Sequence, residues 1–146
     1  MEYLGYPPHF TLAAFDNAEE SELIAAVESL AASLSRIEVR FDRISHFETP
    51  SSIVLWAAPA NPAVLAEIHS QVHERVDSNG CRSNYRPGAW IPHCSLAIAI
   101  DPARRSEAMA IAQTDISSFE VMFDVIDCAR FHPVEVIYER ALPAAA

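Results

Sequence analysis

The chain has 146 residues, 51% of them hydrophobic, and a formal net charge of −10. This length suits a single domain with a sizeable core. The negative charge argues against a protein that wraps a long nucleic acid, because such binding depends on neutralising many phosphates. A small phosphorylated ligand, held by a few local donors, remains compatible with it.

The cysteines and the hydropathy pattern indicate in which cellular compartment the protein lies. Three cysteines without CxxC spacing suggest neither a disulfide framework nor a zinc site. No apolar run approaches the length that spans a membrane, and no basic-then-apolar signal opens the chain. We therefore expect a cytoplasmic protein with no membrane partner.

The first part of the chain predicts the order strand, helix, strand, strand. Residues 8–15 alternate in polarity as a strand does, and 19–35 carry apolar residues at helical spacing. Residues 37–48 alternate again, and 52–58 form a short apolar run after a Thr-Pro-Ser turn.

The second part predicts the same order after a linker. The linker combines a helix over 62–77 with a glycine-bearing loop over 77–90. The elements that follow are a strand (93–100), a helix capped by Asp101 and ending near Gln113, and two strands (119–131 and 134–142).

Two stretches of the chain repeat each other. An offset of 84 residues aligns YPPHFTLAAF (6–15) with WIPHCSLAIA (90–99), and FDRI (41–44) matches FDVI (123–126) at an offset of 82. Since the predicted elements also match, we interpret the repetition as an internal duplication of a β-α-β-β unit. Short turns favour antiparallel pairing of the last two strands in each copy.

The duplication predicts how the chain is organised. We expect one α+β domain over 1–146 that consists of two pseudo-symmetric lobes. The first lobe covers about 1–58 together with the linker helix 62–77, and the second covers about 85–142.

Each repeated motif places a histidine two residues before a hydroxyl. Residues two apart on a strand point to the same side, so His9 would share a face with Thr11, and His93 with Ser95. A pseudo-two-fold axis would bring both faces to one groove. Two imidazoles suit general acid–base catalysis, and the hydroxyls can donate hydrogen bonds to a phosphate. Neither a metal, a cofactor nor a nucleophilic side chain is needed.

PHFTL and PHCSL resemble the paired H-x-T/S motifs of the two-histidine (2H) phosphoesterases, which include 2′-5′ RNA ligases and cyclic nucleotide phosphodiesterases. The resemblance implies a bilobal fold with two antiparallel sheets around a central cleft and helices outside. It also implies metal-independent attack on a 2′,3′-cyclic or other ribose-linked phosphodiester. By motif position, His9 and His93 would be the acid and the base, in an order left open, and Thr11 and Ser95 would bind phosphate.

Residues near the motifs are candidates for substrate contacts. Tyr6 and Trp90 each stand three residues before a motif histidine and could stack a nucleobase. A hydrophobic lid is the favoured interpretation for Tyr6, and both remain open for Trp90. Tyr85 and Arg86 share the loop of Trp90, and Arg86, with Arg82, could bind a second phosphate.

The remaining histidines and the motif cysteine have simpler interpretations. Cys94 lies between His93 and Ser95 and should face the core, so we expect no nucleophile there. His69 and His73 have a spacing that can bind a metal, but no third ligand is evident, so we expect a solvated helix face. His46 and His132 are expected at the surface.

The function that follows is a metal-independent phosphodiesterase that hydrolyses a 2′,3′-cyclic phosphate on a nucleotide or short RNA end. The alternatives are a reversible 2′-5′ RNA ligase, a non-catalytic module that binds a nucleotide phosphate, and a scaffold protein. The expected partner is a small nucleotide or an RNA end.

Overall fold

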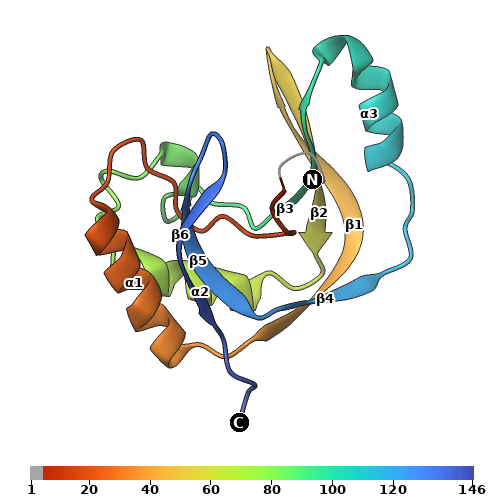
Figure 1. Cartoon of the computed structure of the whole chain (residues 1–146). Helices are drawn as coiled ribbons and strands as arrows, with labels where there is room; N and C mark the ends of the chain where they lie inside the picture. The colour runs from red at the N-terminus through yellow and green to blue at the C-terminus, as the bar shows by residue number, and fades with distance from the viewer. Residues whose placement is uncertain (1–4) are drawn as a thin grey trace. The chain divides into compact units, whose positions relative to one another are not determined.

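A computed structural model describes residues 5–146 (Figure 1). These residues form helices and two antiparallel sheets, which confirms the predicted α+β class. In chain order the main elements are α1 (Glu20–Ser33), β1 (Ile37–Thr49), β2 (Ser52–Pro59), α2 (Ala63–His73), β3 (Cys94–Ile100), α3 (Arg105–Ala112), β4 (Phe119–Phe123), β5 (Val125–Arg130) and β6 (Glu135–Ala141). Short 3-10 helices cover Ser83–Tyr85 and Pro102–Arg104.

The chain divides into two compact units, each drawn from three segments. Among the described residues, unit 1 comprises 5–10, 39–62 and 92–121, and unit 2 comprises 11–38, 63–91 and 122–146. Each unit therefore combines parts of both sequence repeats, whereas the predicted lobes follow one another along the chain. The pseudo-symmetric single domain stays a prediction.

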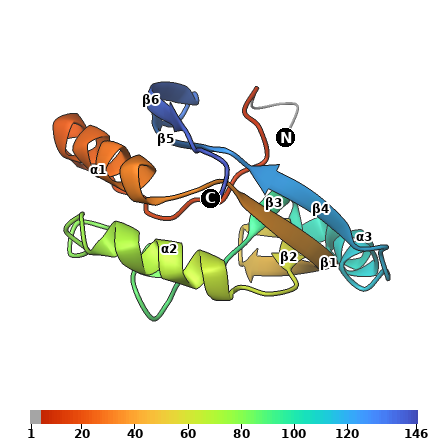
Figure 2. The same ribbon diagram turned by 90° about the horizontal axis from the view of Figure 1, so that it is seen from below.

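Unit 1 is built on the four-stranded sheet, whose strand order is β3-β2-β1-β4. The pairs β1–β2 and β2–β3 are antiparallel, and Trp56 lies opposite Ser45 on one side and Ser95 on the other. Helix α3 covers β2, where Ala108 packs with the buried Ile53 and Leu55. The sheet and α3 are seen from two sides in Figures 1 and 2.

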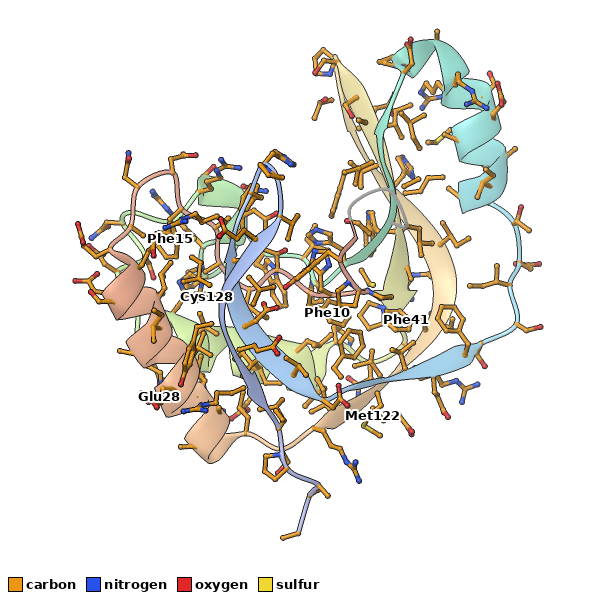
Figure 3. The ribbon with its side chains drawn as sticks, in the orientation of Figure 1. Phe10, Phe15, Glu28, Phe41, Met122 and Cys128 are labelled. Carbon is orange, nitrogen blue, oxygen red and sulfur yellow. The ribbon has the colours of Figure 1, made fainter. Side chains whose placement is uncertain are left out.

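The centre of unit 1 is aromatic. Phe41 is only 1% exposed and stacks on Phe10 and Phe119, with ring centroids 5.9 Å and 5.2 Å away. Figure 3 shows Phe10 and Phe41 next to each other. Phe10 follows His9 in the chain, so its stacking on Phe41 ties the first motif to this core.

Unit 2 combines the antiparallel β5–β6 hairpin with α1 and α2. Helix α1 packs on both strands of the hairpin and also contacts α2, which is visible in Figure 2. The predicted apolar stripes are the buried faces of the helices, since Val27 and Leu30 are buried on α1, and Leu65, Ile68 and Val72 on α2. The β1–β2 and β5–β6 pairings confirm the two antiparallel strand pairs predicted from the short turns.

Each sequence repeat supplies the helix that covers the hairpin of the other. In unit 2, α1 of the first repeat lies on β5 and β6 of the second; in unit 1, α3 of the second repeat lies on β2 of the first. An ion pair joins helix start to strand end in both units. Glu20 pairs with Arg130 in unit 2, and Arg105 pairs with Glu48 at 2.7 Å in unit 1. The two pairs occupy corresponding positions with the charges reversed.

The structure corrects two predicted strands. Residues 8–14 form no strand, and the segment makes only an isolated bridge between Phe15 and Cys81. The strand predicted over 119–131 breaks at Asp124 into β4 and β5, which belong to different sheets. Both errors have one physical cause: alternating polarity shows that a segment has two faces, but it does not determine which strand, if any, the segment pairs with.

The linker helix is also shorter than predicted, because α2 ends at His73. Over the described part of the chain, no helix has the length and apolarity needed to cross a bilayer.

Candidate active site

The second motif is held in a regular sheet. His93 lies directly before β3, and the strand then carries Cys94 and Ser95. Cys94 is 4% exposed, and burial raises the pKa of its thiol. A buried, neutral thiol confirms that Cys94 is a core residue and places Ser95 on the opposite face of the strand.

Two aromatic rings border His93. The ring of Phe47 meets the imidazole edge-on, with centroids 4.9 Å apart, and that of Trp56 does so at 6.0 Å. Phe47 and Trp56 also stack on each other at 4.9 Å. Since Trp56 is the cross-strand neighbour of Ser95, β1, β2 and β3 together build an aromatic wall beside the motif. This wall was not predicted from the sequence; the available signal was that Ser45 and Phe47, two residues apart on β1, share one face of the strand.

The first motif orients its histidine by a local hydrogen bond. Nδ1 of His9 lies 2.9 Å from the carbonyl oxygen of Pro7. A carbonyl only accepts, so Nδ1 carries the proton and Nε2 is the nitrogen that can gain or lose one. The ring of Tyr6 meets His9 edge-on at 4.8 Å; its covering role stays a prediction.

The two motifs meet within unit 1. The backbone N–H of His9 donates a hydrogen bond to the sulfur of Cys94, which opposes the effect of burial on the thiol pKa. Cys94 is the residue after His93, so the first motif histidine lies beside the strand that carries the second. The ring of the next residue, Phe10, stacks on Phe41.

Thr11 belongs to unit 2, since the boundary between the units follows Phe10. The carbonyl oxygen of Thr11 accepts a hydrogen bond from the indole N–H of Trp90 at 2.9 Å. The predicted role of the Thr11 hydroxyl, like that of Ser95, stays a prediction.

Trp90 and Tyr85 both contact His69 within unit 2. Trp90 is nearly parallel to the imidazole of His69, with centroids 4.3 Å apart, so one face of the indole is already covered. The carbonyl oxygen of Tyr85 lies 2.7 Å from Nε2 of His69, and burial raises the pKa of the Tyr85 phenol.

The solvated helix face predicted for His69 and His73 is therefore wrong. His69 is 5% exposed, and burial is the main cause that lowers its pKa. The aromatic partner that buries it comes from a loop 21 residues further along the chain, so the spacing of the histidines alone did not reveal it.

Arg82 and Arg86, the two arginines of the loop, bind other groups of the protein. Arg86 donates to the carbonyl oxygens of Cys81, at 2.7 Å, and Asn79, at 2.8 Å. Arg82 forms an ion pair with Asp16 and lies over the ring of Phe131. These contacts stabilise the loop, and the predicted phosphate contact of Arg86 stays a prediction.

The two remaining histidines, His46 and His132, take no part in the contacts described for the motifs and the loop. His132 is exposed in the turn before β6, and His46 is half-buried in β1. Within residues 5–146, no group of three or more His, Cys, Asp or Glu side chains is arranged to hold a metal ion.

Taken together, unit 1 brings one motif histidine beside the strand that carries the other, with an aromatic wall at one of the rings. An imidazole oriented through Nδ1 can transfer a proton at Nε2, and a second imidazole nearby can complete a general acid–base pair. No curated protein matches the sequence significantly. The family model of the 2′-5′ RNA ligase superfamily matches residues 2–134. Because that match covers most of the chain, the protein belongs to the 2′-5′ RNA ligase superfamily, that is, to the two-histidine phosphoesterases.

Proposed function

We propose that the protein is a metal-independent phosphodiesterase that hydrolyses a 2′,3′-cyclic phosphate, or a related ribose phosphodiester, on a nucleotide or short RNA end. Family membership supports an enzyme of the 2H phosphoesterase or RNA ligase type. The specific reaction is our inference from the duplicated motifs and the geometry of unit 1.

The observation that carries the proposal is the contact between the motifs, in which the His9 backbone binds the sulfur next to His93. A phosphodiester needs one group that accepts a proton from the attacking water and one that donates a proton to the leaving oxygen. His9 and His93 are assigned to these two roles.

The reaction balances without a further reactant. Water attacks phosphorus as one histidine takes its proton, and a bond from phosphorus to a ribose oxygen breaks. The other histidine protonates that oxygen, so the product is a phosphate monoester. Thr11 and Ser95, by their motif positions, would donate hydrogen bonds to the phosphate oxygens of the bound substrate.

The wall of Phe47 and Trp56 supports a role for His93 in proton transfer, because it holds the imidazole in one orientation. Rings that contact the imidazole from β1 and β2 restrict its rotation, and a fixed donor transfers a proton with less reorganisation. The ring of Tyr6 contacts His9 edge-on, which suits a side chain that covers this imidazole.

The test is a panel of cyclic and linear phosphodiesters assayed in EDTA. We expect turnover of a 2′,3′-cyclic nucleotide with a bell-shaped pH profile. His9→Ala and His93→Ala should each lower kcat by roughly two to four orders of magnitude. His132→Ala changes an exposed histidine of unit 2 and is the matched control. Unchanged turnover in either motif variant would refute the assignment.

The alternatives predict different outcomes of the same panel. A 2′-5′ RNA ligase would join RNA halves, and a binding module would retain product without turning over any substrate. The net charge of −10 favours a small partner over a long nucleic acid. The cytoplasmic location stays a prediction of the cysteine pattern.

A further inference from the structure

The first motif lacks a strand, and side chains bind its carbonyl oxygens instead. The indole N–H of Trp90 donates to the carbonyl of Thr11 at 2.9 Å, and Nε2 of His73 lies 3.3 Å from the carbonyl of Leu12. In a strand these acceptors would be bound by a neighbouring backbone. Here two side chains from a loop and a helix of unit 2 take that place.

The two donors are themselves held in place. Trp90 stacks on His69 at 4.3 Å, and His69 lies 4.4 Å from His73. Nε2 of His69 donates to the carbonyl of Tyr85, and Nδ1 of His73 lies 2.9 Å from the hydroxyl of Ser78. A carbonyl only accepts, so both histidines are protonated at Nε2, and the Ser78 hydroxyl can donate to the neutral Nδ1 of His73.

We propose that Trp90, His73 and His69 form a clamp that positions Thr11 for substrate, and we call these three residues the motif clamp. This inference rests on the proposed function, in which the Thr11 hydroxyl binds the phosphate. Trp90 and His73 are positioning residues that act through the backbone of the first motif. His69 acts one step further away, because it holds the ring of Trp90.

The clamp explains why residues from a helix, a loop and the first motif form one cluster. A hydroxyl contributes to phosphate binding only if the backbone that carries it keeps its orientation. For Ser95 the ladder of β2 and β3 supplies that order. For Thr11 the order depends on two side-chain hydrogen bonds, so single substitutions can remove it.

The kinetic test is a double-mutant cycle with Trp90→Phe and Thr11→Val on a 2′,3′-cyclic nucleotide. Trp90→Phe keeps an aromatic ring against His69 but removes the hydrogen bond, and we expect KM to rise about three- to tenfold with little change in kcat. In the Thr11→Val background the same substitution should add nothing, because both act through one contact. An equal loss in both backgrounds, or no change in KM, would overturn the proposal.

The second donor has its own control. His73→Leu should raise KM, and His73→Gln, which retains an N–H donor, should restore part of the loss. His132→Leu makes the same change at an exposed turn of unit 2 and should leave KM unchanged. Thermal unfolding of every variant separates a local effect from loss of the fold.

A structural readout keeps the clamp separate from the catalytic proposal. The two indole N–H signals can be followed by NMR without substrate, and Trp90→Phe identifies the one that belongs to Trp90. His69→Ala should accelerate hydrogen exchange of that signal. If the wild-type protein turns over no phosphodiester, the proposed function fails, while unchanged indole exchange in His69→Ala would refute the clamp.

Discussion

The two copies of the histidine motif have nearly the same sequence but different structural support. PHCSL continues into β3 and pairs with β2. PHFTL forms no strand, and its carbonyl oxygens are bound by Trp90 and His73. A short motif therefore does not determine its own secondary structure; the neighbours that satisfy its backbone do.

The two units are more alike in how their helices pack. In each, the helix of one repeat covers the hairpin of the other, and an ion pair joins the helix start to the strand end. The positions correspond although the charges are reversed, since a glutamate of α1 faces an arginine, and an arginine of α3 faces a glutamate. The arrangement of opposite charges matters here more than which residue carries which sign.

The largest expected effect compares the cores of the units. Phe41→Ala removes a ring that is 1% exposed and should lower the free energy of unfolding by about 3–5 kcal/mol. Leu65→Ala, at 2% exposed in unit 2, should cost about 2–5 kcal/mol. Urea unfolding followed by tryptophan fluorescence measures both.

Val136→Ala is the control for these core variants, because Val136 is 40% exposed. A loss at Phe41 no larger than that at Val136 would contradict the central place of the aromatic stack in unit 1.

The next effect compares the two hydroxyls. If both donate to the phosphate of the bound substrate, Thr11→Val and Ser95→Ala should each lower kcat/KM by about 10- to 100-fold, mainly by raising KM. The clamp makes a further distinction, since Trp90→Phe should alter kcat/KM only while Thr11 is present and should act equally with or without Ser95. Steady-state kinetics of the single and paired variants checks this. Full activity of either hydroxyl variant would remove that residue from the site.

A third comparison uses pH. Burial keeps the pKa of His69 below its ordinary value of 6.5, so the unfolded chain takes up the proton first as the pH falls. The free energy of unfolding should therefore fall as the pH drops below about 6.5 and level off below the folded pKa. Urea midpoints between pH 7.5 and 5 measure the slope.

His69→Gln is the control for this slope. It removes the titrating group, so the stability of the variant should depend less on pH in that window, whatever its absolute stability. The same slope in wild type and variant would show that other groups cause the acid sensitivity.

The smallest effect concerns the reversed ion pairs. The hydrogen bond from Arg105 holds the pKa of Glu48 below its usual range. The side chains of Arg105 and Glu48 are 57% and 35% exposed, so solvent screens the pair and Arg105→Glu should lower Tm only slightly. The double exchange Arg105→Glu with Glu48→Arg, which reproduces the polarity of the pair in unit 2, should restore it. High salt should remove the difference, and a Tm loss that persists at high salt would assign the effect to packing.

Much of the local structure was predictable from the sequence. The helical spacing of Val27 and Leu30 identified the buried stripe of α1, and the alternation around short turns identified the β1–β2 and β5–β6 pairs. The repeated PHx[ST]L motif led to the family that the match over residues 2–134 shows. These features follow from side chains close together in the chain, so their periodicity reports them directly.

Which segments of the chain meet could not be read from local patterns. The two copies of the histidine motif and most of the elements after them are visible in the sequence, but the packing of each helix on the hairpin of the other repeat is not. It also missed the burial of His69, because the covering ring of Trp90 comes from a distant loop. Periodicity identifies the apolar face of an element, whereas its partner and its backbone hydrogen bonds depend on residues far away in the chain.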